Sequence, residues 1–209
     1  MALLHKVPRI KKGLDYLQKH DPVFSRNPAN RDDFTWEYVG PGFTGLARIV
    51  IGQQVSTAAA RSIWKKLESG MDVTPKKIIK AHENDLRGFG LSRSKVIYLK
   101  GLAEAVHKGH FDPESMEKFS NAEVYNAVTA MKGFGPWSAQ MFLMFGLARS
   151  DIWSPGDLGM QYGLQHYLKL KEKPDLQKSE RQEKRFSPHQ TAASLLLWHM
   201  HGTIKTGTE

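Results

Sequence analysis

One carboxylate in this chain, Asp157, follows a glycine-rich turn and stands apart from the surface charge. The turn is G-F-G-P-W, and Asp157 lies twenty residues after its last member, Trp137, within the segment S-P-G-D-L-G. A lone carboxylate can act as a general base or stabilise positive charge. It can equally cap a helix, because aspartate is among the preferred N-cap residues. The segment alone leaves both roles open for Asp157, and one residue could fill both.

The glycine-rich turn offers a second kind of chemistry, the binding of phosphate by the main chain. Gly133 and Gly135 permit positive φ angles and put no Cβ in the way of a ligand. Such a turn, with the start of the following helix, can place N–H groups against a phosphate without reading base sequence. The alternative is a tight helix–helix turn with glycine at a C-cap.

Composition narrows the classes of protein that fit. The 209 residues carry a formal charge of +9, which favours a polyanionic partner, although membrane-surface proteins and many ordinary enzymes share this bias. The absence of cysteine excludes disulfides, thiolate zinc sites, iron–sulfur clusters and a catalytic cysteine. The nine histidines show no metal-ligand spacing. We find no signal-peptide core or membrane-spanning run and expect an intracellular protein, cytoplasmic or nucleoid-associated in a prokaryote and nuclear in a eukaryote.

Helical periodicity dominates the chain and predicts an all-α fold. Leu46, Ile49 and Val50 share a helix face with Gln53, and the Lys169 to Lys184 stretch is a charged helix or connector. Helix starts are marked by capping residues, sometimes followed by proline or by a capping-box glutamate. These are Ser56, Thr74-Pro75, Ser92, Ser120 with Glu123, and Ser187-Pro188.

A repeated sequence motif indicates two related helical units. L-R-G-F-G-L-S-R-S-K-V, from Leu86, aligns glycine on glycine with M-K-G-F-G-P-W-S-A-Q-M, from Met131, at an offset of 45 residues. We interpret each as helix, G-F-G turn and helix, a duplicated supersecondary unit. The first copy is interpreted as structural, with at most one phosphate contact from Arg93 or Lys95. We expect two helical lobes with a cleft between them.

Together these motifs carry a family resemblance. K-G-F-G-P-W-S-A resembles the helix-hairpin-helix signature of the base-excision DNA glycosylases, and S-P-G-D-L-G falls where that superfamily keeps its catalytic aspartate. I-V-I-G-Q-Q-V-S-T-A-A-A and R-F-S-P-H-Q-T-A-A-S-L-L-L-W are similar to segments of its 3-methyladenine DNA glycosylase II (alkylpurine) branch. The similarity runs from about Phe43 to Trp198. It implies one glycosylase domain over residues 1–209, two-lobed, with a DNA-binding cleft and the helix-hairpin-helix at about 121–147.

The resemblance also implies a reaction. Enzymes of this family rotate a damaged nucleotide out of the duplex and cut its bond to deoxyribose. It assigns Asp157 as the catalytic carboxylate that stabilises the sugar cation. Trp137 occupies the position of the lysine that lyases use, which implies monofunctional hydrolysis of alkylated purines such as 3-methyladenine and 7-methylguanine. The alternatives are removal of oxidised or deaminated purines, and a non-catalytic protein that binds damaged DNA.

Further residues receive roles from the resemblance. The substrate pocket is assigned to Trp137, Phe186, Trp153 and Phe43, with Trp36 and Tyr38 as further candidates, and core packing is the alternative for each. DNA contacts are assigned to Lys132, Gly133, Phe134, Gly135, Gln53 and Gln54. Gln54 lies where some relatives have a leucine wedge and could fill the gap left by the rotated base; alternatively, both glutamines cap a buried turn. The implied partner is damaged double-stranded DNA bound by a monomer, with no membrane and no cofactor other than a monovalent cation on the hairpin carbonyls.

Overall fold

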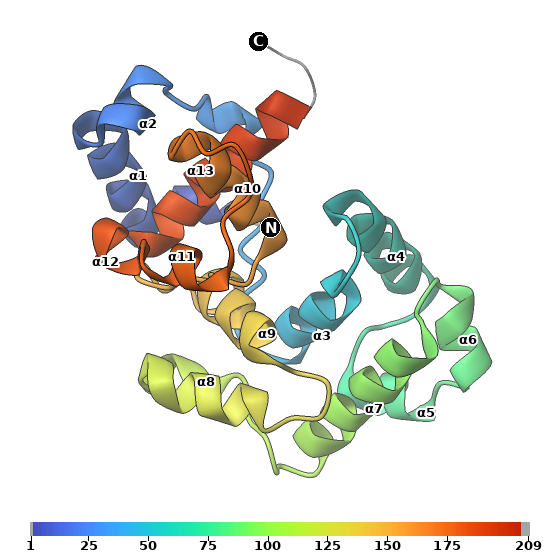
Figure 1. Cartoon of the computed structure of the whole chain (residues 1–209). Helices are drawn as coiled ribbons and strands as arrows, with labels where there is room; N and C mark the ends of the chain where they lie inside the picture. The colour runs from blue at the N-terminus through green and yellow to red at the C-terminus, as the bar shows by residue number, and fades with distance from the viewer. Residues whose placement is uncertain (1, 206–209) are drawn as a thin grey trace. The chain divides into compact units, whose positions relative to one another are not determined.

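The computed structural model describes residues 2–205, and helices make up its regular structure (Figure 1). Within that range the only pairing of strand type is an isolated bridge between Leu3 and Glu37. The prediction of an all-α fold is confirmed. Among the described residues no helix combines the length and apolar character needed to cross a membrane.

The chain divides into two compact units, and unit 1 combines the N-terminal and C-terminal parts of the chain, Met1–Tyr38 and Ala148–Glu209. In this unit α13 packs against α1 and α10, and α1 also packs against α2. Its core includes an aromatic cluster in which Phe186 contacts Phe24 and Tyr167. The helices of unit 1 are α1 (Pro8–His20), α2 (Pro22–Arg26), α10 (Leu158–Tyr167), α11 (Leu176–Glu180), α12 (Glu183–Phe186) and α13 (Gln190–Lys205), with short 3-10 turns at Leu4–Lys6 and Arg31–Asp33.

The second unit is continuous and runs from Val39 to Leu147. Its central helix α3 packs against α4, α7 and α9, while α7 covers α5 and α8 packs on α9. The apolar face predicted from Leu46, Ile49 and Val50 is buried. The helices of unit 2 are α3 (Phe43–Gly52), α4 (Thr57–Gly70), α5 (Pro75–Lys80), α6 (Glu83–Gly88), α7 (Arg93–His107), α8 (Asn121–Thr129) and α9 (Pro136–Met141), with a 3-10 turn at Ser115–Lys118 and a π-helical turn at Phe142–Gly146.

Four of the five predicted helix starts are confirmed by their caps. The side chains of Ser56, Thr74, Ser92 and Ser120 each accept a main-chain N–H three residues on, and Glu123 completes the capping box. The start predicted at Ser187-Pro188 is wrong, because α13 begins at Gln190. There the carboxylate of Asp151 takes the capping role, accepting from the Gln190 N–H at 3.4 Å and from Ser187 Oγ at 2.8 Å.

The two G-F-G segments share a sequence but differ in backbone conformation. In the first copy the second glycine, Gly90, has φ +102°, whereas Gly88 still belongs to α6. In the second copy the first glycine, Gly133, has φ +88°, and Gly135 has φ −96°. The repeated motif therefore correctly predicted the helix–turn–helix order of each copy, but the two turns do not share a backbone geometry. Only in the second copy do both glycines lie outside the flanking helices.

Candidate active site and nucleic-acid interface

Asp157 is the N-cap of α10, and its carboxylate is anchored by two donors within unit 1. Its Oδ1 atom accepts the Met160 N–H at 2.8 Å and the indole Nε1–H of Trp198 at 2.7 Å. The side chain is half-buried. The capping role is therefore observed, and the second donor goes beyond what a cap needs. A carboxylate held by an indole at short distance keeps one fixed orientation, since hydrogen bonds to charged groups are the stronger kind.

Two glycines of α10 allow Trp198 to reach this carboxylate from α13. A Cβ at Gly163 would collide with the main-chain carbonyl of Leu197, so the two helices can approach closely only because this position is glycine. A Cβ at Gly159 would lie 3.0 Å from Trp198 Cδ1 and 3.3 Å from Asp157 Oδ1. Such small residues on the facing side of α10 place the indole directly over the cap.

Trp198 is a site residue that the sequence analysis missed. It lies 41 positions from Asp157, so no local spacing connects the two, and its only signal was its place at the end of the segment R-F-S-P-H-Q-T-A-A-S-L-L-L-W. Its ring also lies near Trp36, with centroids 6.1 Å apart, and Trp36 in turn packs edge-on against Phe34. Trp36, named above as a further pocket candidate, therefore lies beside Trp198, the residue whose indole holds Asp157.

Three of the four aromatics assigned to the substrate pocket are core residues in this structure. Phe186 is 1% exposed, Trp153 is 6% exposed and its Nε1 donates to Ser179 O, and Phe43 is 5% exposed at the start of α3. Core packing, the alternative stated for each, describes these three. Trp137, on α9 in unit 2, is half-buried and keeps part of its ring accessible. Its role as a pocket residue stays a prediction.

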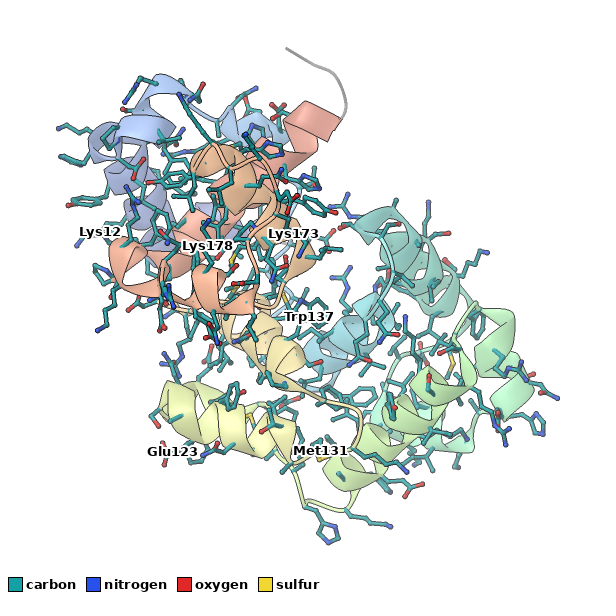
Figure 2. The ribbon with its side chains drawn as sticks, in the orientation of Figure 1. Lys12, Glu123, Met131, Trp137, Lys173 and Lys178 are labelled. Carbon is teal, nitrogen blue, oxygen red and sulfur yellow. The ribbon has the colours of Figure 1, made fainter. Side chains whose placement is uncertain are left out.

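The predicted hairpin lies between α8 and α9, with Met131 just beyond the end of α8 and Trp137 at the start of α9 (Figure 2). Gly133 is at positive φ, and a Cβ there would collide with the Tyr98 ring. Gly135 does not use the positive φ that glycine permits: its φ is −96°, and a Cβ there would meet no atom within 4 Å. Gly133 therefore shapes the turn, while Gly135 leaves open space at its surface.

The start of α9 at the hairpin has no side-chain cap. Gly135, the N-cap residue, is exposed, as is Lys132 at the entrance of the turn. The first N–H groups of a helix lack partners within it and attract anions. Phe134, assigned to DNA contact, is 4% exposed, so its side chain anchors the turn in unit 2 rather than facing a ligand.

The two glutamines that follow α3 have different environments. Gln53 Nε2 donates to Gly133 O at 2.8 Å and to Ser138 Oγ at 2.9 Å. The side chain assigned to DNA contact is thus bound to the hairpin, in agreement with the alternative of a turn-capping glutamine. Gln54 is exposed and has φ +56°, a conformation that L-residues other than Asn and Asp rarely adopt. The capping alternative therefore fits Gln53 but not Gln54.

Among residues 2–205 no group of three or more His, Asp or Glu side chains could hold a metal ion. A cation at the hairpin would have to use main-chain oxygens. Met131 O accepts the Phe134 N–H and Gly133 O accepts Gln53 Nε2, and each carbonyl retains a second lone pair. The main chain thus has acceptor capacity for a monovalent cation, whose binding stays a prediction.

Curated proteins similar to this chain are named for alkylpurine repair. A DNA-3-methyladenine glycosylase of Saccharomyces cerevisiae is 32% identical over 200 residues, covering 77% of this chain and 67% of the relative. DNA-3-methyladenine glycosylase 1 of Schizosaccharomyces pombe is also 32% identical, over 158 residues that cover 73% of this chain and 69% of the relative. These relatives confirm the resemblance to the 3-methyladenine branch that the motifs indicated.

The fold and the family agree with these sequences. The structure is similar to the 3-methyladenine DNA glycosylase Mag1 of Schizosaccharomyces pombe solved in complex with abasic DNA, with a TM-score of 0.82 and 28% identity. The match covers 90% of this chain and 95% of that one. Residues 47–188 match the family model of the HhH-GPD superfamily, the base excision DNA repair proteins, and this range contains the hairpin, Gln54 and Asp157. The chain belongs to the HhH-GPD superfamily of base excision DNA repair proteins.

Proposed function

We propose that this protein is a monofunctional DNA glycosylase that excises alkylated purines, of the 3-methyladenine and 7-methylguanine type, from double-stranded DNA. The observation that carries the proposal is the anchored carboxylate of Asp157, held by Met160 and Trp198 in the loop where the superfamily has its catalytic aspartate. The names of the two yeast relatives support the substrate class, and the DNA complex of Mag1 supports the partner.

The anchored geometry suits stabilisation of a sugar cation. As the purine leaves, positive charge develops on the deoxyribose, and a fixed carboxylate lowers the energy of that state without reorganising. The indole and main-chain donors both bind Oδ1, so they set the plane of the carboxylate through one oxygen. The same carboxylate can orient the water molecule that attacks the sugar. Alkylation makes the base cationic, so it is a good leaving group that needs little further activation.

Binding of the duplex would depend mainly on the DNA backbone. The uncapped start of α9 at Gly135 and the exposed Lys132 suit a phosphate contact that does not depend on base sequence. Gln54 is exposed on its turn, and in this proposal it enters the duplex where the damaged base has rotated out. An amide can hydrogen-bond the unpaired partner base, which a leucine cannot.

The proposal excludes a lyase step. A lyase needs an amine that attacks the sugar, and Trp137 stands in the position of that amine. The nearest lysine in the sequence, Lys132, leaves the chain before the turn and is exposed on the hairpin entrance. Water is then the nucleophile and an intact abasic strand is the product.

The test is incubation with dimethyl-sulfate-treated DNA, followed by chromatography of the released bases. Release of 3-methyladenine and 7-methylguanine, with none from untreated DNA, is the expected result. Parallel duplexes carrying 8-oxoguanine or hypoxanthine test the first alternative, since release of only those bases would replace the alkylpurine assignment. Retention of damaged duplex without release of any base would instead indicate a binding protein.

A further inference from the structure

The exposed turn at Gln54 and Val55 connects two firmly capped helix ends. The turn follows α3, and Ser56 accepts the Ala59 N–H at 3.2 Å to begin α4. Gln54 has φ +56°, which is unfavourable for glutamine by about 1 kcal/mol or more. Since Gln54 itself does not favour this conformation, neighbouring residues must hold it.

The first G-F-G segment supplies one of these neighbours, Lys95. Its ammonium Nζ donates to the carbonyl oxygen of Ile51 at 2.7 Å, and the residue is only 8% exposed. Ile51 lies in the last turn of α3, where carbonyl groups lack helical partners and a cation is favourable. Burial lowers the pKa of Lys95 below its ordinary value, in keeping with its removal from water. The phosphate contact considered for Lys95 is therefore wrong, because its charge faces the protein.

The second G-F-G segment supplies a further contact to the end of α3. Gln53, the residue directly before Gln54, donates to Gly133 O and to Ser138 Oγ in the hairpin. Three residues, Ile51, Gln53 and Ser56, are thus fixed around a two-residue tip. A lysine of α7 and the hairpin before α9, both in unit 2, fix the end of α3.

We propose that Lys95 and Gln53 are positioning residues that together hold the Gln54 turn in the conformation that meets duplex DNA. The inference rests on the glycosylase function proposed above and adds a role for the first G-F-G segment, which presents Lys95 to α3 instead of contacting DNA. Neither residue touches the substrate. Both act through Gln54.

The test compares Lys95→Met with a matched control on the same helix, Lys100→Met. Lys100 Nζ donates to Ile79 O at 3.1 Å and Ala81 O at 2.6 Å, so it caps the end of α5 as Lys95 caps the end of α3. Each variant loses an ammonium group that binds main-chain carbonyl oxygens, but only Lys95 borders the Gln54 turn. Both variants should lose stability, which thermal unfolding will report.

Single-turnover release of 7-methylguanine from a duplex gives the first readout. We expect Lys95→Met to slow release about tenfold, within what the loss of one charge-assisted hydrogen bond allows, and Lys100→Met to stay within about twofold of wild type. In a Gln54→Ala background, Lys95→Met should add less than about twofold, because a residue that acts through Gln54 has nothing left to position. An equal effect of Lys95→Met in both backgrounds would overturn the proposal.

Amide hydrogen exchange gives a readout that does not depend on activity. Residues 52–55 should exchange about tenfold faster in Lys95→Met and unchanged in Lys100→Met. If Lys95→Met does not fold, Gln53→Met serves in both measurements, with the same expected results. Unchanged exchange over 52–55 in the folded variant contradicts the proposal, whereas faster exchange in a protein that releases no base contradicts only the glycosylase function.

Discussion

Replacing Trp198 by phenylalanine should slow base release by removing a hydrogen bond that anchors Asp157. The indole Nε1–H donates to Asp157 Oδ1 at 2.7 Å, and phenylalanine keeps an aromatic ring but has no donor. Hydrogen bonds to charged groups contribute about 1.5–3 kcal/mol. The Met160 N–H, at 2.8 Å, still holds the same oxygen, so only part of the orientation is lost. We expect the rate of the chemical step to fall about tenfold, near the lower bound of that range.

The assay is single-turnover release of 7-methylguanine with enzyme in excess over duplex. Trp153→Phe is the matched control, since it removes an indole N–H that donates to Ser179 O at 2.9 Å within the same unit. Both variants lose ring volume and a hydrogen bond, buried for Trp153 and part-buried for Trp198, so both should lower the midpoint of thermal unfolding. Only Trp198→Phe should slow release while duplex affinity is retained. A rate for folded Trp198→Phe that matches Trp153→Phe would refute the anchoring role.

Three further predictions address the hairpin, the reaction type and the pH dependence of stability. Gly133→Ala should lower the free energy of unfolding by about 2 kcal/mol or more, because Gly133 has a positive φ and its Cβ would collide with the Tyr98 ring. Gly135→Ala should change the free energy of unfolding by less than about 0.5 kcal/mol, because a Cβ there meets no atom, and should still weaken binding to damaged and undamaged duplex alike. A Gly135→Ala protein with wild-type affinity for both duplexes would remove the hairpin from the interface. Borohydride should trap no protein–DNA adduct at early times, and an adduct that forms as fast as base release and disappears in Lys132→Ala would identify a lyase. Burial lowers the pKa of three histidines of unit 1, His5, His189 and His199, below the ordinary value of 6.5. Below that pH the unfolded chain therefore binds more protons than the folded protein, so the melting temperature should fall as the pH drops from 7 to 5. The fall should be less steep in His199→Phe. A melting temperature that is constant over this range would contradict that linkage.

Local patterns in the sequence predicted much of the fold because they act over a few residues. Apolar periodicity identified α3, and serine or threonine caps identified the starts of four helices. The start of α13 was misplaced because its cap, Asp151, comes from 39 residues away in the chain. A cap supplied from a distance leaves no signal near the helix that it begins.

The same distinction between local and distant interactions applies to the site. Asp157 and the hairpin were found because each lies in a short, recognisable segment. Trp198 was missed because only the packing of α13 on the glycine face of α10 brings it to Asp157. Lys95 was considered for a phosphate contact because lysine side chains usually face solvent, and its partner, a main-chain carbonyl of α3, cannot be recognised from residue types.

The central claim, that the Asp157 carboxylate drives base release, is tested most directly by Asp157→Asn. Asparagine is an N-cap of similar strength, and its amide oxygen can accept from Met160 and Trp198, so the fold and the anchors should be retained while the charge is lost. We expect single-turnover release of 7-methylguanine to fall about 10²–10³-fold, with the dissociation constant for the damaged duplex within about twofold of wild type. Release by Asp157→Asn at the wild-type rate would contradict the claim.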